Sequence, residues 1–78
     1  MTPLIRLGLL LTRERTAAGW SQLDLAERAK LHHATIGCLE RGEVDQPRRV
    51  LDLLWLCQAS IMVLQYADHL ARQIARDR

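Results

Sequence analysis

The residue types that could do chemistry gather on one face of a short helix predicted in the middle of the chain. At helical spacing this face carries His33, Ala34, Gly37, Cys38 and Arg41. An imidazole donates or accepts a hydrogen bond, and an alanine methyl group gives an apolar contact. The small side chains between them would let another molecule approach the helix closely. This combination favours the binding of a surface over the turnover of a substrate.

The same residues do not form a catalytic or metal-binding arrangement. A histidine and a thiol share the predicted face, but no third group orients them, and the chain has neither paired carboxylates nor a glycine loop that binds phosphate. Cys38 and Cys57 have no second cysteine at zinc-binding spacing, and the three histidines do not supply one. We therefore expect no enzyme activity, no metal, no cofactor, and two reduced thiols.

The length and charge of the chain limit the class of protein. Seventy-eight residues allow one domain, 1–78, and a core this thin often gains stability by dimerisation. The net charge of +2 permits a polyanionic partner without requiring one. Arginines interrupt the N-terminal apolar run, and the longest uncharged run, 53–67, is too short for a membrane span. We expect a soluble, cytoplasmic protein with no membrane partner.

Hydrophobic periodicity predicts only helices, so the expected fold class is all-α, a compact bundle of four to five helices. Hydroxyl caps, prolines and glycines mark the ends of the segments, and Ser21 and Asp24 are spaced for a capping box. The two short helices within 21–41, joined by a tight turn, have the layout of a helix-turn-helix, whose second helix enters the DNA major groove. The predicted helices are 2–18, a second from 21 to a four-residue turn around 30–33, a third from that turn to about 41, and then 47–57 and 60–76.

Residues 11–61 resemble the lambda-repressor/Cro-like (Xre-type) helix-turn-helix family of DNA-binding regulators. The resemblance covers roughly two-thirds of the chain and depends on many linked positions rather than on one short motif. It implies a lambda-repressor-like DNA-binding domain. The positions that carry it are Arg15, Gly19, Ser21, Gln22, Leu25, Ala26, Thr35, Ile36, Leu39, Glu40, Arg41, Gly42 and Pro47.

The DNA contacts that the resemblance implies divide between phosphates and bases. Gln22 corresponds to the family's glutamine at the start of the second helix, whose amide and backbone N–H contact a phosphate. His33, Ala34 and Cys38 match base-contacting positions, with Gly37 on the same face. For the two neighbouring histidines, the alternative is an exposed loop position without a role. The further expected phosphate contacts are His32, Thr35, Arg41 and Arg48.

The resemblance also implies a structural pair, and the chain departs from the family at several points. Arg15 and Glu40 correspond to a buried ion pair that ties the first helix to the end of the third. Lys30 replaces the usual turn glycine, where a left-handed backbone would cost roughly 1 kcal/mol. Gln58 replaces another common glycine. The base-contacting face carries no glutamine, asparagine or arginine from 33 to 38, so specificity would depend partly on methyl contacts and DNA shape.

Apolar residues in the last two predicted helices are the candidates for a dimer interface. The helix 47–57 is apolar on more than one face, and the helix 60–76 carries a continuous apolar stripe. For Leu64 and Leu70 the alternative is ordinary packing in the core of one chain. The candidate interface residues are Trp55, Ile61, Val63, Leu64, Tyr66, Leu70 and Ile74.

These features predict a sequence-specific DNA-binding transcription regulator that acts as a homodimer on a pseudo-palindromic operator. The expected subtype is a small phage-type repressor or a restriction–modification controller protein, bacterial or phage-encoded. The first alternative is a HipB-like antitoxin that binds its own operator and a toxin partner, with a short strand at 61–64. An alternative of another class is a protein-interaction module without DNA binding.

Overall fold

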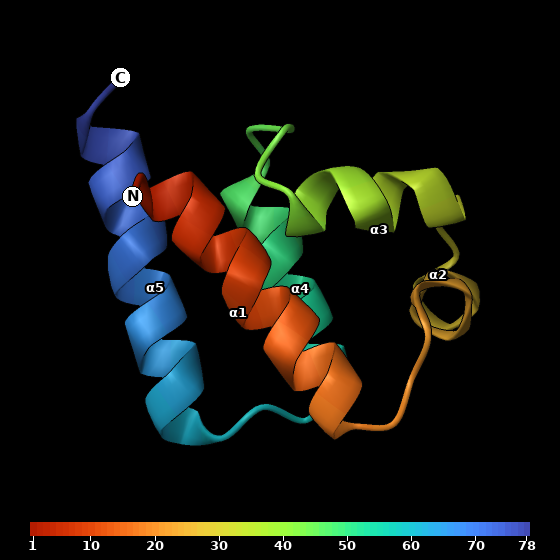
Figure 1. The fold of residues 1–78 in the computed structure, drawn as a ribbon. Coiled ribbons are helices and arrows are strands. Elements are labelled where there is room, and N and C mark those ends of the chain that lie inside the picture. The colour runs from red at the N-terminus through yellow and green to blue at the C-terminus, as the bar shows by residue number, and fades with distance from the viewer.

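The computed structural model describes residues 1–78 and contains five α-helices and no strand (Figure 1). The predicted all-α bundle is confirmed, and every predicted helix is present within one residue of its expected bounds. The strand considered at 61–64 is not formed, because these residues are helical. None of the helices combines the length and apolar character that crossing a bilayer requires. The helices are α1 (Pro3–Ala17), α2 (Gln22–Ala29), α3 (His33–Glu40), α4 (Pro47–Leu56) and α5 (Ile61–Arg76).

Side-chain caps explain where the first two helices begin. Thr2 Oγ1 accepts a hydrogen bond from the backbone N–H of Ile5 at 3.2 Å, and Pro3 occupies the start of α1. The predicted capping box of α2 is present: Ser21 Oγ accepts from the backbone N–H of Asp24 at 3.0 Å, and Asp24 Oδ2 accepts from that of Ser21 at 2.9 Å. The backbone hydrogen bond from Ser21 lowers the pKa of the Asp24 carboxyl. These caps give partners to N–H groups that a helix start leaves unpaired.

Two non-glycine residues adopt a left-handed backbone at the turns between helices. Lys30 ends α2 with φ 57°, and Gln58, between α4 and α5, has φ 59°. Both residues occupy positions where the lambda-repressor/Cro-like family, which this chain resembles, commonly has glycine. The left-handed backbone that was considered for Lys30 is present. A side chain in this conformation costs roughly 1 kcal/mol. The chain therefore keeps the turn geometry without the glycines.

Helix α1 lies at the centre of an aliphatic core. Figure 1 shows α1 crossing between α5 on one side and α3 and α4 on the other, and it contacts all three helices. Gly8 permits its close approach to the end of α3, because a Cβ there would overlap the backbone of Glu40 and lie 2.7 Å from the carbonyl oxygen of Leu39. The largest fully buried side chains are Leu7, Leu11, Leu25, Ile36, Leu39, Val50, Leu53 and Leu54.

Much of the apolar face of α5 is buried in this core. Leu70 is 3% exposed and Ile74 is 9% exposed. The prediction that these two residues belong to a dimer interface is therefore wrong, because their own chain already covers them. Val63 and Leu64 are half-buried and keep part of their surface.

Candidate functional site

Helices α2 and α3 are joined by a turn of only three residues, 30–32. Figure 1 views α2 end-on and α3 from the side, so the two helices cross steeply. The backbone N–H of Leu31 donates to the carbonyl of Ala26 at 2.9 Å, which closes the turn. Ile36 and Leu39 then fix one side of α3 in the core. The opposite side of the helix faces outward.

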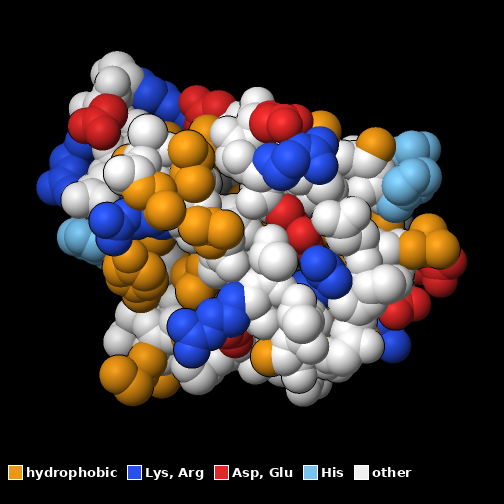
Figure 2. Space-filling model, in the orientation of Figure 1, with side chains coloured by type: hydrophobic (Ala, Val, Ile, Leu, Met, Phe, Trp, Pro, Cys, Tyr) orange, Lys and Arg blue, Asp and Glu red, His pale blue; other side chains and the backbone are white.

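Helix α3 begins with a histidine cap. Nδ1 of His32 accepts a hydrogen bond from the backbone N–H of Ala34 at 3.1 Å, so the imidazole replaces the usual hydroxyl or carboxylate cap. The rings of His32 and His33 stack with their centroids 4.5 Å apart. Both histidines and Ala34 are exposed, whereas Thr35 is half-buried. Figure 2 shows histidine side chains projecting at the end of the molecule where α3 begins.

A buried carboxylate joins three helices. Glu40, the last residue of α3, is 7% exposed. The ion pair that the resemblance implies is present: Arg15 Nε lies 2.5 Å from Oε2 of Glu40, and Arg15 Nη2 lies 3.2 Å from Oε1. Gln22 Nε2 also donates to Oε1 of Glu40, at 3.0 Å. Through these contacts α1 and the start of α2 are tied to α3, and the amide of Gln22 is oriented.

The guanidinium of Arg41 lies back over α3. Its Nη2 is 3.7 Å from Sγ of Cys38, and a Cβ on Gly37 would lie 3.1 Å from its Nη1, which explains why Gly37 is buried. Glu43 accepts from Arg41 through two bonds, Nε to Oε2 at 2.8 Å and Nη2 to Oε1 at 3.3 Å. This pairing raises the pKa of Arg41 and lowers the pKa of Glu43. Glu43 was not among the predicted site residues. Its position two residues after Arg41 is nevertheless a signal in the sequence that the two side chains could pair.

Arg48 provides positive charge without an acidic partner. It stands in the first turn of α4, is exposed, and takes part in none of the ion pairs of the structure. By contrast, Arg72 pairs with Asp68 at 2.8 Å, and Arg78 pairs with Asp45. Arg48 is thus available to an anion in a way that Arg72 and Arg78 are not.

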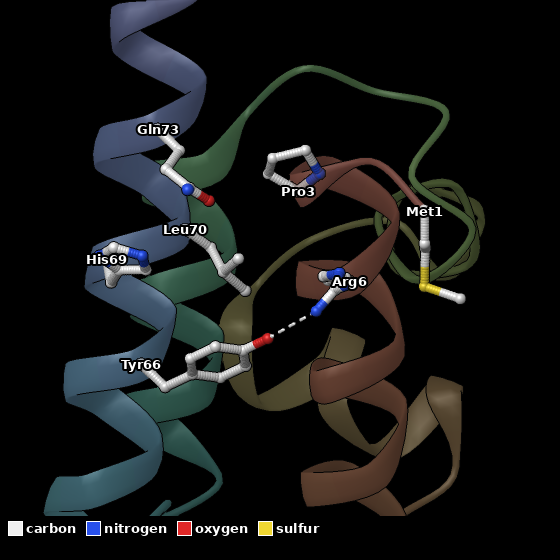
Figure 3. A pocket seen from close by; sticks show the side chains of 7 residues that line it. All are labelled: Met1, Pro3, Arg6, Tyr66, His69, Leu70 and Gln73. Carbon is white, nitrogen blue, oxygen red and sulfur yellow. Dashed lines mark hydrogen bonds between the residues drawn. The ribbon is translucent and has the colours of Figure 1, made fainter.

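A hollow lies between α1 and α5 and is lined by Met1, Pro3, Arg6, Tyr66, His69, Leu70 and Gln73 (Figure 3). Arg6 Nη1 donates to Oη of Tyr66 at 3.3 Å, which joins the two helices (Figure 3). Tyr66, one of the predicted interface residues, keeps 43% of its surface exposed. No group of three or more histidine, cysteine, aspartate or glutamate side chains is placed to hold a metal ion.

Large apolar side chains remain exposed where α4 meets α5. This surface, called here the α4–α5 corner, consists of Trp55, Leu56, Ile61 and Met62. The exposed fractions are 69% for Trp55, 69% for Ile61 and 77% for Met62. Leu56 and Met62 were not predicted as interface residues, because the sequence pattern alone does not separate core from surface in a helix apolar on several faces.

Comparison with known proteins gives one match. The model of a protein family described as a helix-turn-helix domain matches residues 6–65. The match runs from α1 into the first turns of α5 and includes every residue expected to contact DNA. No curated protein and no solved structure matches the chain.

Proposed function

The chain belongs to the helix-turn-helix domain family, and we propose that it is a sequence-specific DNA-binding transcription regulator whose α3 enters the major groove. The observation that carries the proposal is the two-sided character of α3. Ile36 and Leu39 are buried in the core, whereas His33 and Ala34 on the other side are exposed. A helix held on one side and open on the other can insert into a groove about 12 Å wide.

Phosphate contacts would orient α3 in the groove. Arg48 suits this role because it is exposed and has no acidic partner. Gln22 occupies the first position of α2, where unpaired backbone N–H groups favour an anion. His33 would then form a hydrogen bond with a base edge, and Ala34 would contact a thymine methyl group.

The lambda-repressor/Cro-like type is the proposed branch of the family. It is supported by the Arg15–Glu40 pair and by the left-handed Lys30 and Gln58 at positions where that type carries glycine. A small phage-type repressor or restriction–modification controller protein is the proposed subtype. The helical conformation of 61–64 favours it over the HipB-like antitoxin, for which a strand would be expected there.

We propose further that the regulator is a homodimer joined through the α4–α5 corner, since burial of its exposed apolar surface favours association. Two α3 helices related by a two-fold axis would then enter successive major-groove turns about 34 Å apart. Replacing Trp55 by glutamate is expected to convert the dimer into monomers in sedimentation equilibrium at micromolar concentration. Leu9→Glu, at a 50% exposed position of α1, is the matched control. A monomeric wild-type protein at that concentration would contradict the dimer.

The thiol of Cys38 offers a test of DNA contact by α3. Cys38 is half-buried on the outward side of α3, whereas Cys57 is 7% exposed, and burial raises the pKa of the Cys57 thiol. A neutral alkylating reagent should therefore modify Cys38 well before Cys57. A saturating random-sequence DNA duplex at low salt is expected to slow the alkylation of Cys38 strongly and to leave Cys57 unaffected.

The control for this experiment is Arg48→Ala. Loss of one phosphate contact should weaken protection for all sequences and reduce the salt dependence of binding by about one unit of slope. If the duplex binds but Cys38 stays fully reactive, α3 is not the DNA-contacting helix. If no duplex binds, a protein-interaction module becomes the better hypothesis.

A further inference from the structure

A long polar side chain, that of Arg41, lies over the outward side of α3 although the residue itself follows the end of the helix. No arginine, glutamine or asparagine lies from 33 to 38. Arg41 caps the C-terminal end of α3, and its side chain extends back toward the start of the helix, over Gly37 and as far as Sγ of Cys38. Since Gly37 and Cys38 belong to the predicted base-contacting face, the guanidinium lies on that face.

The guanidinium is held by a carboxylate at one edge and has no acidic partner at the other. Nε and Nη2 donate to the two carboxylate oxygens of Glu43 at 2.8 and 3.3 Å, a forked contact that fixes the plane of the group. The second edge, formed by Nη1 and the remaining hydrogen of Nη2, has no acidic partner; Nη2 donates to the sulfur of Cys38 at 3.7 Å, a weak acceptor that a base oxygen or nitrogen could replace. The side chain as a whole is 58% exposed. Two parallel N–H donors of this kind match the O6 and N7 acceptors of guanine in the major groove.

We propose that Arg41 recognises a guanine base, with Glu43 holding the guanidinium and Gly37 providing the space for it. This inference rests on the proposed DNA-binding function and gives Arg41 a role other than the phosphate contact that the family resemblance implies. A carboxylate at 2.8 Å would repel a phosphate brought to the same guanidinium. The carboxylate of Glu43 does not repel an uncharged base. It also limits rotation of the guanidinium, and such rotation would let the group donate to other bases. Arg48, which has no such neighbour, is the better phosphate ligand.

The test is the selection of bound duplexes from a random-sequence pool by the wild-type protein, Arg41→Ala, Glu43→Gln and Arg48→Ala. The wild-type protein is expected to enrich a guanine at one fixed position of each half-site. Arg41→Ala should reduce that single-position preference by about 5- to 150-fold and leave the other positions unchanged. Glu43→Gln should weaken the same preference while binding other sequences more tightly, because a negative charge facing DNA is removed. Arg48→Ala should lose affinity and keep the guanine.

The outcomes separate this inference from the proposed function. If Arg41→Ala lowers affinity equally for all sequences and keeps every base preference, Arg41 contacts a phosphate and the inference is overturned, while the DNA-binding function stands. If Glu43→Gln keeps the full guanine preference, Glu43 does not hold the guanidinium in the complex. If the wild-type protein enriches no sequence, the proposed function fails together with the inference.

Discussion

Replacement of Arg15 by methionine is expected to lower the free energy of unfolding by about 3–5 kcal/mol, because it leaves the carboxylate of Glu40 buried without a counter-charge. The side chain of Glu40 is 6% exposed and that of Arg15 is 14% exposed, so water cannot replace the guanidinium without opening the structure. The carbonyl of Trp20, which accepts from Arg15 Nη1 at 2.7 Å, also loses its partner. Folded domains are stable by only about 5–15 kcal/mol, and small ones lie at the low end. The variant should therefore be close to unfolded.

Urea denaturation followed by circular dichroism measures this loss. Arg13→Met is the matched control, because the side chain of Arg13 is 80% exposed and its removal should change stability by less than about 0.5 kcal/mol. Adding Glu40→Gln to Arg15→Met should recover part of the stability, since a buried amide costs less than a buried carboxylate. An Arg15→Met protein that unfolds at the wild-type urea concentration would show that the ion pair does not hold α1 to α3.

Replacement of Gly8 by alanine is expected to lower the free energy of unfolding by about 3 kcal/mol, the upper end of the usual cost of overpacking. The added Cβ would meet backbone atoms of Glu40 and Leu39, which cannot rotate away as a side chain can. In a helix, alanine is otherwise more favourable than glycine by roughly 0.5–1 kcal/mol, so the intrinsic preference has the opposite sign. A loss of stability would therefore report the close contact between α1 and α3.

Gly37→Ala is the control for that substitution. Gly37 is also a buried glycine inside a helix, but its Cβ would meet only side-chain atoms, the tip of Arg41 at 3.1 Å and Oε1 of Gln22 at an ordinary contact distance of 3.7 Å. This variant should keep or increase the melting temperature, because alanine favours the helix and the arginine can move. Equal losses for Gly8→Ala and Gly37→Ala would contradict the role given to Gly8.

The helix boundaries could be predicted because their signals are local. Ser21 and Asp24 identify the start of α2 through bonds within one turn, and the structure contains both. The Arg15–Glu40 pair joins residues far apart in the sequence, and it was accessible only through the family resemblance. The left-handed backbone at Lys30 could also be predicted only from the family resemblance, because a lysine does not by itself indicate this conformation.

The features of the structure that could not be predicted from the sequence are those that depend on how the helices pack against one another. Leu70 and Ile74 lie on a stripe that would suit either a dimer or a core, and only the position of α5 against the other helices assigns them to the core. The need for glycine at position 8 arises from the backbone of α3, which periodicity in α1 does not reveal. The location of the Arg41 guanidinium depends on Glu43 and on the absence of a side chain at Gly37, three residues that no single pattern links.

Recognition of a particular DNA sequence by α3 in a homodimer can be tested by sequencing the duplexes that the wild-type protein retains from a random pool. The predicted result is a pseudo-palindrome whose half-sites are centred about one helical turn apart, with a base preference that changes in His33→Ala. Retained duplexes without a common sequence, or no retained DNA at low salt, would contradict it.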